Sequence, residues 1–185
     1  MSKKLYLGLI GEAGSGKDTV AEVLEEKYGA RVLTSSYLLK KALGVFLDSI
    51  GRADYIWFVK ELTSKYGEDI ISKAMLKAMR SFTDDIVVFN GVRLPSDYEY
   101  LKKERSFLVY VTADPQVRWQ RVSRRHEKAD DDIPFDKFME MHQTKTEIDV
   151  PELGKKADYT ITNNGTLEEL HAQIDEVMKS IKEQV

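Results

Sequence analysis

Residues 7–19 constrain the fold more than any other part of this 185-residue chain. They read LGLIGEAGSGKDT, so an apolar run enters a glycine-rich turn that leads into a helical pattern. Gly11, Gly16 and Lys17 fit the spacing G-x-x-x-x-G-K-[ST], in which glycines let the backbone approach phosphate oxygens and the lysine reaches the β- and γ-phosphates. Unpaired backbone N–H groups at the start of the next helix also attract these phosphate groups. The segment therefore predicts a strand, a phosphate-binding loop and a helix.

The loop departs from that spacing at the position of the metal-binding hydroxyl. Asp18 stands there, and Thr19 follows one residue later. Magnesium takes one or two carboxylates together with phosphates and water, so Asp18 is the first candidate ligand. Thr19 is the second, although it points about 100° further round the helix. The predicted nucleotide-binding residues of the loop are Gly11, Ala13, Gly14, Ser15, Gly16, Lys17, Asp18 and Thr19.

Composition narrows the class of protein. A net charge of −3 gives no broad basic surface, which argues against nucleic acid as the main partner. The chain has no cysteine, which excludes disulfides, thiolate zinc sites and cysteine nucleophiles. No apolar run is long enough to cross a membrane, and residues 5–10 are too short for a signal peptide. We expect a cytoplasmic protein without membrane partners, either a monomer or a homodimer.

Short apolar runs alternate with longer amphipathic segments, which is typical of β-α units around a mainly parallel sheet. Apolar residues on both faces of the runs indicate a five-stranded sheet covered by helices on each side, and therefore an α/β fold. We expect strands at 5–10, 30–34, 86–90, 107–112 and 159–162. The expected helices span 17–28, 36–50, 55–82 with a break at Gly67, 96–103, 115–127, 134–147 and 167–183.

The chain shows no internal repeat or low-complexity linker, so residues 1–185 are expected to form one domain. The helical block at about 36–82 interrupts the β-α alternation and suggests a lobe that binds a phosphoryl acceptor. Local chemistry supports two helix starts. Asp114 precedes a proline at the first helical position, and Thr166 with Glu169 forms a capping box.

Arginines after the third and fourth strands are candidates for phosphate contact. Arg93 follows a strand at the carboxyl end of the expected sheet, where ligands of parallel sheets bind. Arg118, Arg121 and Arg125 lie within about 60° of one another on a helical wheel, so they can face one anion. A surface salt bridge for Arg93, and a solvated helix face for the other three, are the simpler alternatives.

Several segments, in the same order along the chain, resemble P-loop small-molecule kinases of the nucleoside or deoxynucleoside monophosphate kinase and dephospho-coenzyme A kinase group. They are GSGKDTVA at 14–21, SSYLLK at 35–40, FNGVR at 89–93, the arginines from 118 to 125, and ADYTITNNGT at 157–166. The resemblance implies the three-layer P-loop NTPase fold, with a helical acceptor region and a lid at about 115–147. It also implies ATP as phosphoryl donor and Mg²⁺ as metal.

The resemblance assigns roles to individual residues. Phosphoryl transfer would involve Lys17, Arg93, Arg121 and Arg125, and the acceptor would contact Ser36, Lys40, Arg93 and Arg118. Asn163 and Gly165 would lie beside the nucleotide base, and Mg²⁺ would contact Asp18 directly and Asn90 through water. Lys40 replaces the arginine of the family pattern and lacks its bidentate fork. Asn90 replaces an acidic residue and adds no negative charge.

These features predict a kinase that transfers the γ-phosphoryl group of a nucleotide to a small nucleotide-like acceptor. A nucleoside or deoxynucleoside monophosphate is the leading acceptor, and dephospho-coenzyme A is the nearest alternative. A nucleotide-binding regulatory switch, or a weak NTPase, is the alternative of another class, because Asp18 and Asn90 are unusual at metal positions. The sequence leaves open both the acceptor and the choice between ATP and GTP.

Overall fold

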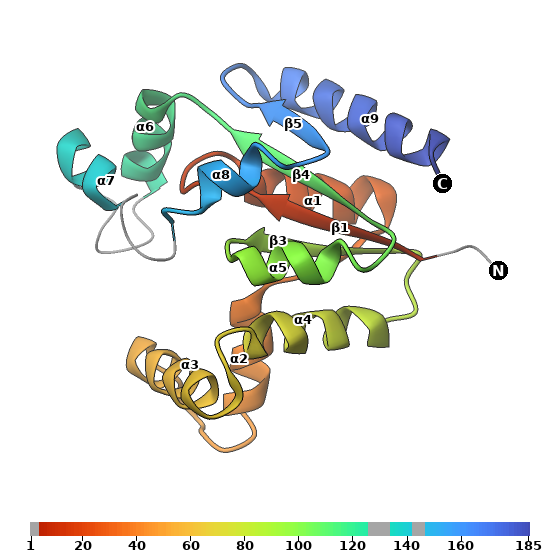
Figure 1. Ribbon diagram of the computed structural model, residues 1–185. Helices are drawn as coiled ribbons and strands as arrows, with labels where there is room; N and C mark the ends of the chain where they lie inside the picture. Colours follow the sequence, from red (N-terminus) through yellow and green to blue (C-terminus); the bar gives the residue numbers. More distant parts are fainter. Residues whose placement is uncertain (1–3, 126–133, 142–146) are drawn as a thin grey trace.

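A computed structural model describes residues 4–125, 134–141 and 147–185 (Figure 1). The strands are β1 (Leu5–Ile10), β2 (Arg31–Leu33), β3 (Ile86–Val92), β4 (Ser106–Thr112) and β5 (Tyr159–Thr162). The helices are α1 (Lys17–Tyr28), α2 (Ser35–Leu43), α3 (Arg52–Tyr66), α4 (Ile70–Ser81), α5 (Pro95–Leu101), α6 (Pro115–Arg125), α7 (Phe135–Met141), α8 (Val150–Gly154) and α9 (Leu167–Glu183).

The strands form one parallel sheet in the order β2-β3-β1-β4-β5. β1 lies at its centre and is buried along its whole length. The order places β1 between β3 and β4, so the segments that follow these three strands lie at the same edge of the sheet. This arrangement confirms the predicted α/β fold with its five-stranded parallel sheet.

Alternating side chains send two apolar clusters to the two faces of the sheet. On one face, Leu5, Leu7 and Leu9 pack with the buried residues of α1 and α9. On the other face, Tyr6 and Ile10 pack with buried residues of α4, α5 and α8. Figure 1 shows the resulting three layers, with α2 and α3 projecting from one end and α6 and α7 from another.

Most elements agree with the sequence pattern, and the differences have local causes. The helix expected at 36–50 ends at Leu43, because Gly44 caps it and a turn follows. The helical block at 55–82 is broken at Gly67 as predicted, and its first helix begins earlier, at Arg52. β3 extends two residues beyond the expected strand, through Gly91, whose φ of 113° accompanies a register shift against β1.

Two further differences lie near the expected lid. The helix predicted for 134–147 does not reach Glu147, which lies in a turn; residues 142–146 are outside the described chain. α8 was not predicted, because its five residues include Pro151 and give no amphipathic repeat. The Thr166 and Glu169 capping box is present at α9. Within the described ranges, no helix has the length and apolar character needed to cross a membrane.

Candidate functional site

The loop between β1 and α1 has the geometry of a phosphate cradle. Gly14 and Gly16 have φ angles of 78° and 92°, which side chains rarely tolerate. A Cβ at Gly16 would also lie 2.1 Å from Nδ2 of Asn163. Gly16 caps α1 without any side-chain hydrogen bond, so the backbone N–H groups of the first turn are left for an external anion. The strand, loop and helix predicted from residues 7–19 are all present.

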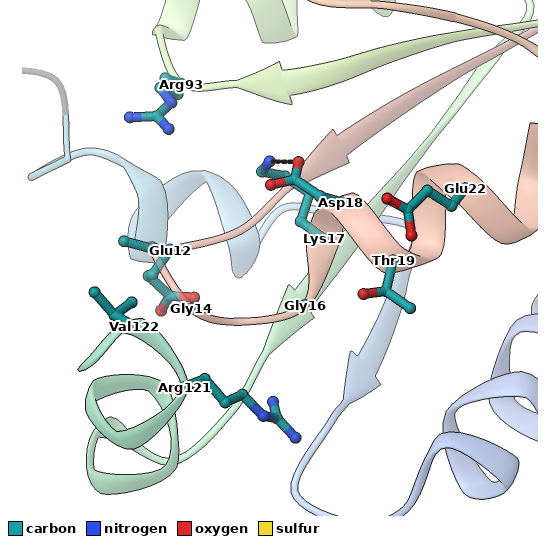
Figure 2. A pocket seen from close by; sticks show the side chains of 11 residues that line it. Glu12, Gly14, Gly16, Lys17, Asp18, Thr19, Glu22, Arg93, Arg121 and Val122 are labelled. Atoms are coloured by element: carbon teal, nitrogen blue, oxygen red, sulfur yellow. Dashed lines mark hydrogen bonds and ion pairs between the residues drawn. The ribbon is translucent and has the colours of Figure 1, made fainter. Parts of the chain in front are cut away.

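A cavity of about 470 Å³ opens beside the loop (Figure 2). It lies between the loop, the start of α1, the end of β3 and one side of α6. Its described lining residues are Glu12, Ala13, Gly14, Gly16, Lys17, Asp18, Thr19, Glu22, Arg93, Arg121 and Val122. Residues from three predicted motifs therefore meet in one place.

Lys17 and Asp18 form an ion pair in the first turn of α1. Nζ of Lys17 donates a hydrogen bond to Oδ1 of Asp18 at 2.7 Å, and Nδ2 of Asn90 donates to the same oxygen at 2.8 Å. The Lys17 side chain is 12% exposed, whereas that of Asp18 is 70% exposed. Asn90 thus ties the end of β3 to α1 through Asp18. A triphosphate bound in the cradle would replace Asp18 as the partner of Lys17.

Arg93 is held at the cavity by two acidic residues. The carboxylate of Asp97 accepts hydrogen bonds from the backbone N–H groups of Arg93 and Leu94, each at 3.1 Å. The guanidinium of Arg93 is paired with Glu147, which lies before α8. Burial lowers the pKa of Arg93, while nearby Asp18 and Asp97 raise it. Arg93 therefore reaches the cavity as predicted, but a carboxylate already occupies one face of its guanidinium.

Arg121 reaches the cavity from α6 and also contacts the last loop of the sheet. Its Nη1 donates to the backbone carbonyl of Asn163 at 2.9 Å. The side chain of Asn163 is buried and donates from Nδ2 to the carbonyl of Ser15 at 2.9 Å. Asn163 thereby connects α6 with the phosphate loop. Partial burial lowers the pKa of Arg121 without a compensating acidic neighbour among the described residues.

Arg118 lies inside the protein. It is 5% exposed, its Nε donates to the carbonyl of Ala113 at 3.1 Å, and its guanidinium lies over the ring of Phe138. Glu12 and Tyr110 raise the pKa of Arg118 electrostatically, against the larger lowering by burial. The expectation that Arg118 and Arg121 face one site is not met in the described chain, because Arg118 does not line the cavity. The side chain of Arg125 lies outside the described part.

The other predicted contacts fall in three groups. Gly11 and Ser15 are buried in the loop behind the cavity, where the hydroxyl of Ser15 has no hydrogen-bond partner among the described residues. Ser36 and Lys40 are exposed on α2, and Gly165 is exposed before α9; none of them lines the cavity. Their contacts with a substrate stay predictions.

Sequence reasoning missed Glu12, Glu22 and Val122 as lining residues. Glu12 occupies one of the variable positions of the loop pattern, which leaves its chemistry unspecified. Oε1 of Glu12 accepts a hydrogen bond from the hydroxyl of Tyr110 at 2.6 Å. Burial, followed by this hydrogen bond, raises the pKa of Tyr110 to about 12. The two residues are 98 positions apart, so no local pattern could have joined them.

Unpaired buried polar atoms gather around this site. In the described chain they include Oε2 of Glu12, Oγ of Ser15, Oδ1 of Asn90 and Oε2 of Glu147. Leaving a buried polar group without a partner costs about 1–3 kcal/mol, so such groups normally bond to protein, water or ligand. Their concentration near one cavity is typical of a site prepared for a polar ligand.

The residues at the start of α1 fit a magnesium ion. Magnesium prefers oxygen ligands and completes its shell with phosphate and water. The exposed carboxylate of Asp18 supplies one such oxygen beside the cradle, and buried Asn90 has an unpaired amide oxygen next to it. Thr19 projects from α1 in a different direction from Asp18 (Figure 2). The described residues contain no cluster of three or more acidic or histidine ligands, so phosphate oxygens would have to complete the shell.

Comparisons with known proteins agree with this geometry. The sequence profile described as AAA domain matches residues 7–145. A UPF0200 protein of Sulfurisphaera tokodaii is 28% identical over 182 residues, covering 98% of this chain and 99% of that protein. Shikimate kinase from Bacteroides thetaiotaomicron has a similar structure, with a TM-score of 0.63, 16% identity and coverage of 96% and 98%. Dephospho-CoA kinase from Campylobacter jejuni has a TM-score of 0.61 and 16% identity, and the match covers 98% of this chain and 98% of that chain. The two structures show likeness of fold.

Proposed function

Because this chain belongs to the AAA domain family and has the fold of the P-loop kinases, we propose that it is an ATP-dependent small-molecule kinase. It transfers the γ-phosphoryl group to a nucleotide-like acceptor, with a nucleoside or deoxynucleoside monophosphate as the first candidate. One observation carries the proposal. The phosphate cradle with Lys17, and two arginines from distant elements, line the same cavity.

The chemistry needs positioning and positive charge more than covalent participation by side chains. An acceptor oxygen forms the bond to the γ-phosphorus, the bond from that phosphorus to the bridging oxygen breaks, and ADP leaves. The cradle and Lys17 hold the donor, and Arg93 and Arg121 approach from the segment after β3 and from α6. Arg125 is a further proposed contact. Bound Mg²⁺, held by Asp18 with support from Asn90, would neutralise charge on the donor phosphates.

Dephospho-CoA stays the second candidate acceptor, because a buried carboxylate, Glu12, lines the cavity where a hydroxyl could be received. The panel that tests the proposal therefore contains ribonucleoside and deoxyribonucleoside monophosphates of each base together with dephospho-CoA. The full chain is incubated with ATP, Mg²⁺ and each acceptor, and products are separated and identified by mass. We expect one acceptor class to be phosphorylated.

Lys17→Met tests whether the cradle carries the reaction. Loss of a preorganised charge contact to the transferred group lowers kcat by about 10²- to 10³-fold. Lys27→Met is the matched control, because Lys27 lies further along α1, outside the cavity, paired with exposed Asp175. It should keep wild-type turnover. Absence of any phosphorylated acceptor would reject the kinase proposal, and acceptor-independent ATP hydrolysis would favour the switch or weak NTPase.

A further inference from the structure

Glu12 is the feature of the cavity that phosphate binding leaves unexplained. The residue is only 8% exposed, yet it lines the cavity beside the phosphate loop. One carboxylate oxygen accepts the hydrogen bond from Tyr110, and the other, Oε2, is buried without a hydrogen-bond partner in the described chain. Because a carboxylate repels phosphate, Glu12 does not serve to bind the phosphates of the donor nucleotide.

The position of Glu12 separates it from the donor end of the cavity. Figure 2 shows its carboxylate near Gly14 of the loop and Val122 of α6, whereas Thr19 and Glu22 lie along α1 on the other side. Lys17 and Asp18, which would hold the donor phosphates and the metal, lie between these two sides (Figure 2). Glu12 therefore lies on the side of Lys17 and Asp18 away from Thr19 and Glu22, and we assign that side of the cavity to the acceptor.

Nearby charges restrict what the free oxygen of Glu12 can receive. An anionic phosphate offers only acceptor oxygens to a carboxylate, and both carry negative charge. A cationic group would meet Arg118, which is close enough to Glu12 for the carboxylate to raise its pKa. A neutral hydrogen-bond donor avoids repulsion both by the carboxylate of Glu12 and by the guanidinium of Arg118. The hydroxyl groups on the sugars of nucleotides are such donors.

We propose that Oε2 of Glu12 accepts a hydrogen bond from a hydroxyl group of the phosphoryl acceptor, which makes Glu12 a specificity-determining residue. This inference rests on the proposed kinase function and narrows its acceptor to molecules with a hydroxyl at that place. The hydroxyl has two sources. It belongs to the sugar of a nucleoside monophosphate whose phosphate oxygen attacks the γ-phosphorus, or it is itself the group that is phosphorylated. In the second case its oxygen bonds to the γ-phosphorus, ADP leaves, and the proton passes to Glu12.

The test compares ligands that differ only in hydroxyl groups. Wild-type protein and Glu12→Gln are titrated, with calorimetric detection, with nucleoside 5′-monophosphates carrying ribose, 2′-deoxyribose or 2′,3′-dideoxyribose. Dephospho-CoA is titrated in the same way beside its analogues that lack one ribose hydroxyl. We expect removal of the recognised hydroxyl to weaken wild-type binding by about 10- to 100-fold, as for a hydrogen bond to a charged group. Glu12→Gln should bind the hydroxylated ligand about as weakly as wild type binds its deoxy analogue, with little further loss when both changes are combined.

Glu22→Gln is the matched control, because Glu22 lines the same cavity but is exposed on α1. Its loss of charge should change the affinity of hydroxylated and deoxy ligands by the same factor. The thermal unfolding of each variant is measured alongside, and the wild-type comparison of ligands needs no variant to fold. Product analysis separates the two sources. Phosphorylation of the acceptor's phosphate yields a nucleoside diphosphate, whereas phosphorylation of the recognised hydroxyl itself yields a new phosphate ester.

Binding and turnover report on different claims. If no ligand is phosphorylated but hydroxyl-dependent binding is lost in Glu12→Gln, the kinase proposal fails, and Glu12 is left as a residue that recognises a hydroxyl of a bound nucleotide rather than of a phosphoryl acceptor. If wild-type binding does not depend on any hydroxyl, or no member of the panel binds, the role of Glu12 is overturned. An equal loss for hydroxylated and deoxy ligands in Glu12→Gln also overturns it, because that result reports only the structural contact with Tyr110.

Discussion

Replacing Asp97 by alanine should destabilise the protein strongly, although Asp97 does not line the cavity. Asp97 is 5% exposed and lies in the first turn of α5. Its carboxylate accepts three hydrogen bonds, from Oγ of Ser72 at 2.6 Å and from the backbone N–H groups of Arg93 and Leu94 at 3.1 Å. It joins α4 and α5 to the end of β3, where Arg93 enters the cavity.

The size of the effect follows from these contacts. A hydrogen bond to a charged group contributes about 1.5–3 kcal/mol, and the three bonds are not additive because they share one carboxylate. Burial raises the pKa of Asp97 above its usual value of 3.8, and this effect exceeds the lowering by its hydrogen bonds. The loss of stability in Asp97→Ala therefore comes mainly from the buried donors that are left without an acceptor, which cost about 1–3 kcal/mol each. We expect Asp97→Ala to lower the free energy of unfolding by about 3 kcal/mol. In a chain of this length that is about 6–12 °C in Tm.

Thermal unfolding followed by circular dichroism measures this change, and Asp54→Ala is the matched control. Asp54 occupies the same helical position in α3, but its carboxylate accepts one backbone hydrogen bond, from Gly51 at 2.7 Å. Losing such a cap costs about 1 kcal/mol. A loss of stability in Asp97→Ala no greater than in Asp54→Ala would refute the reasoning.

The raised pKa of Asp97 also sets the direction of a pH dependence. Below its usual value of 3.8, Asp97 is protonated in the folded and unfolded states alike. As pH rises, the unfolded state ionises first, so the free energy of unfolding of wild type falls relative to Asp97→Asn until pH exceeds the raised pKa. Unfolding in denaturant between pH 3.5 and pH 7, at roughly half-unit steps, measures the difference. If the free energy of unfolding of wild type rises with pH relative to that of Asp97→Asn, the pKa of Asp97 is not raised in the folded state.

Two further substitutions test the loop. Gly16→Ala forces a side chain onto a φ of 92° and into Nδ2 of Asn163, so we expect ATP affinity measured by calorimetry to fall at least about tenfold. Gly29→Ala is the control. Gly29 has a φ of 65°, but a Cβ added there has no neighbouring atom within 4 Å, so the variant carries only the backbone strain and should bind ATP normally. Asp18→Ser replaces the carboxylate by the hydroxyl of the usual pattern, and the Mg²⁺ concentration that gives half-maximal turnover should shift. An unchanged Mg²⁺ dependence would remove Asp18 from the metal site.

The elements that the sequence predicted well are those specified by short stretches of chain. β1, the loop and α1 follow from one continuous motif, in which glycines meet the backbone requirement and apolar residues fill the centre of the sheet. The break at Gly67 and the cap at Thr166 are equally local. Arg93 was placed at the cavity because the carboxyl ends of parallel strands meet at one edge.

The pairings across the site could not be predicted, because they depend on residues brought together by the whole fold. A helical wheel places Arg118 beside Arg121, but it does not include Phe138 and Glu12, which surround Arg118 in the folded chain. Glu12 and Tyr110 are likewise joined only through the neighbouring strands β1 and β4. Periodicity reports which way a side chain points from its own helix, and not what it meets there.

The same limit applies to counting charges for a phosphate site. Arg93 and Arg121 both line the cavity, but Arg93 is paired with the carboxylate of Glu147, whereas Arg121 is bonded to the neutral carbonyl of Asn163. A phosphate that approaches Arg121 adds charge to a neutral contact, whereas at Arg93 it competes with a charge of its own sign. Anion binding at Arg93 therefore meets repulsion from Glu147. The affinity of the cavity for phosphate depends on the partner of each arginine as well as on the number of arginines nearby.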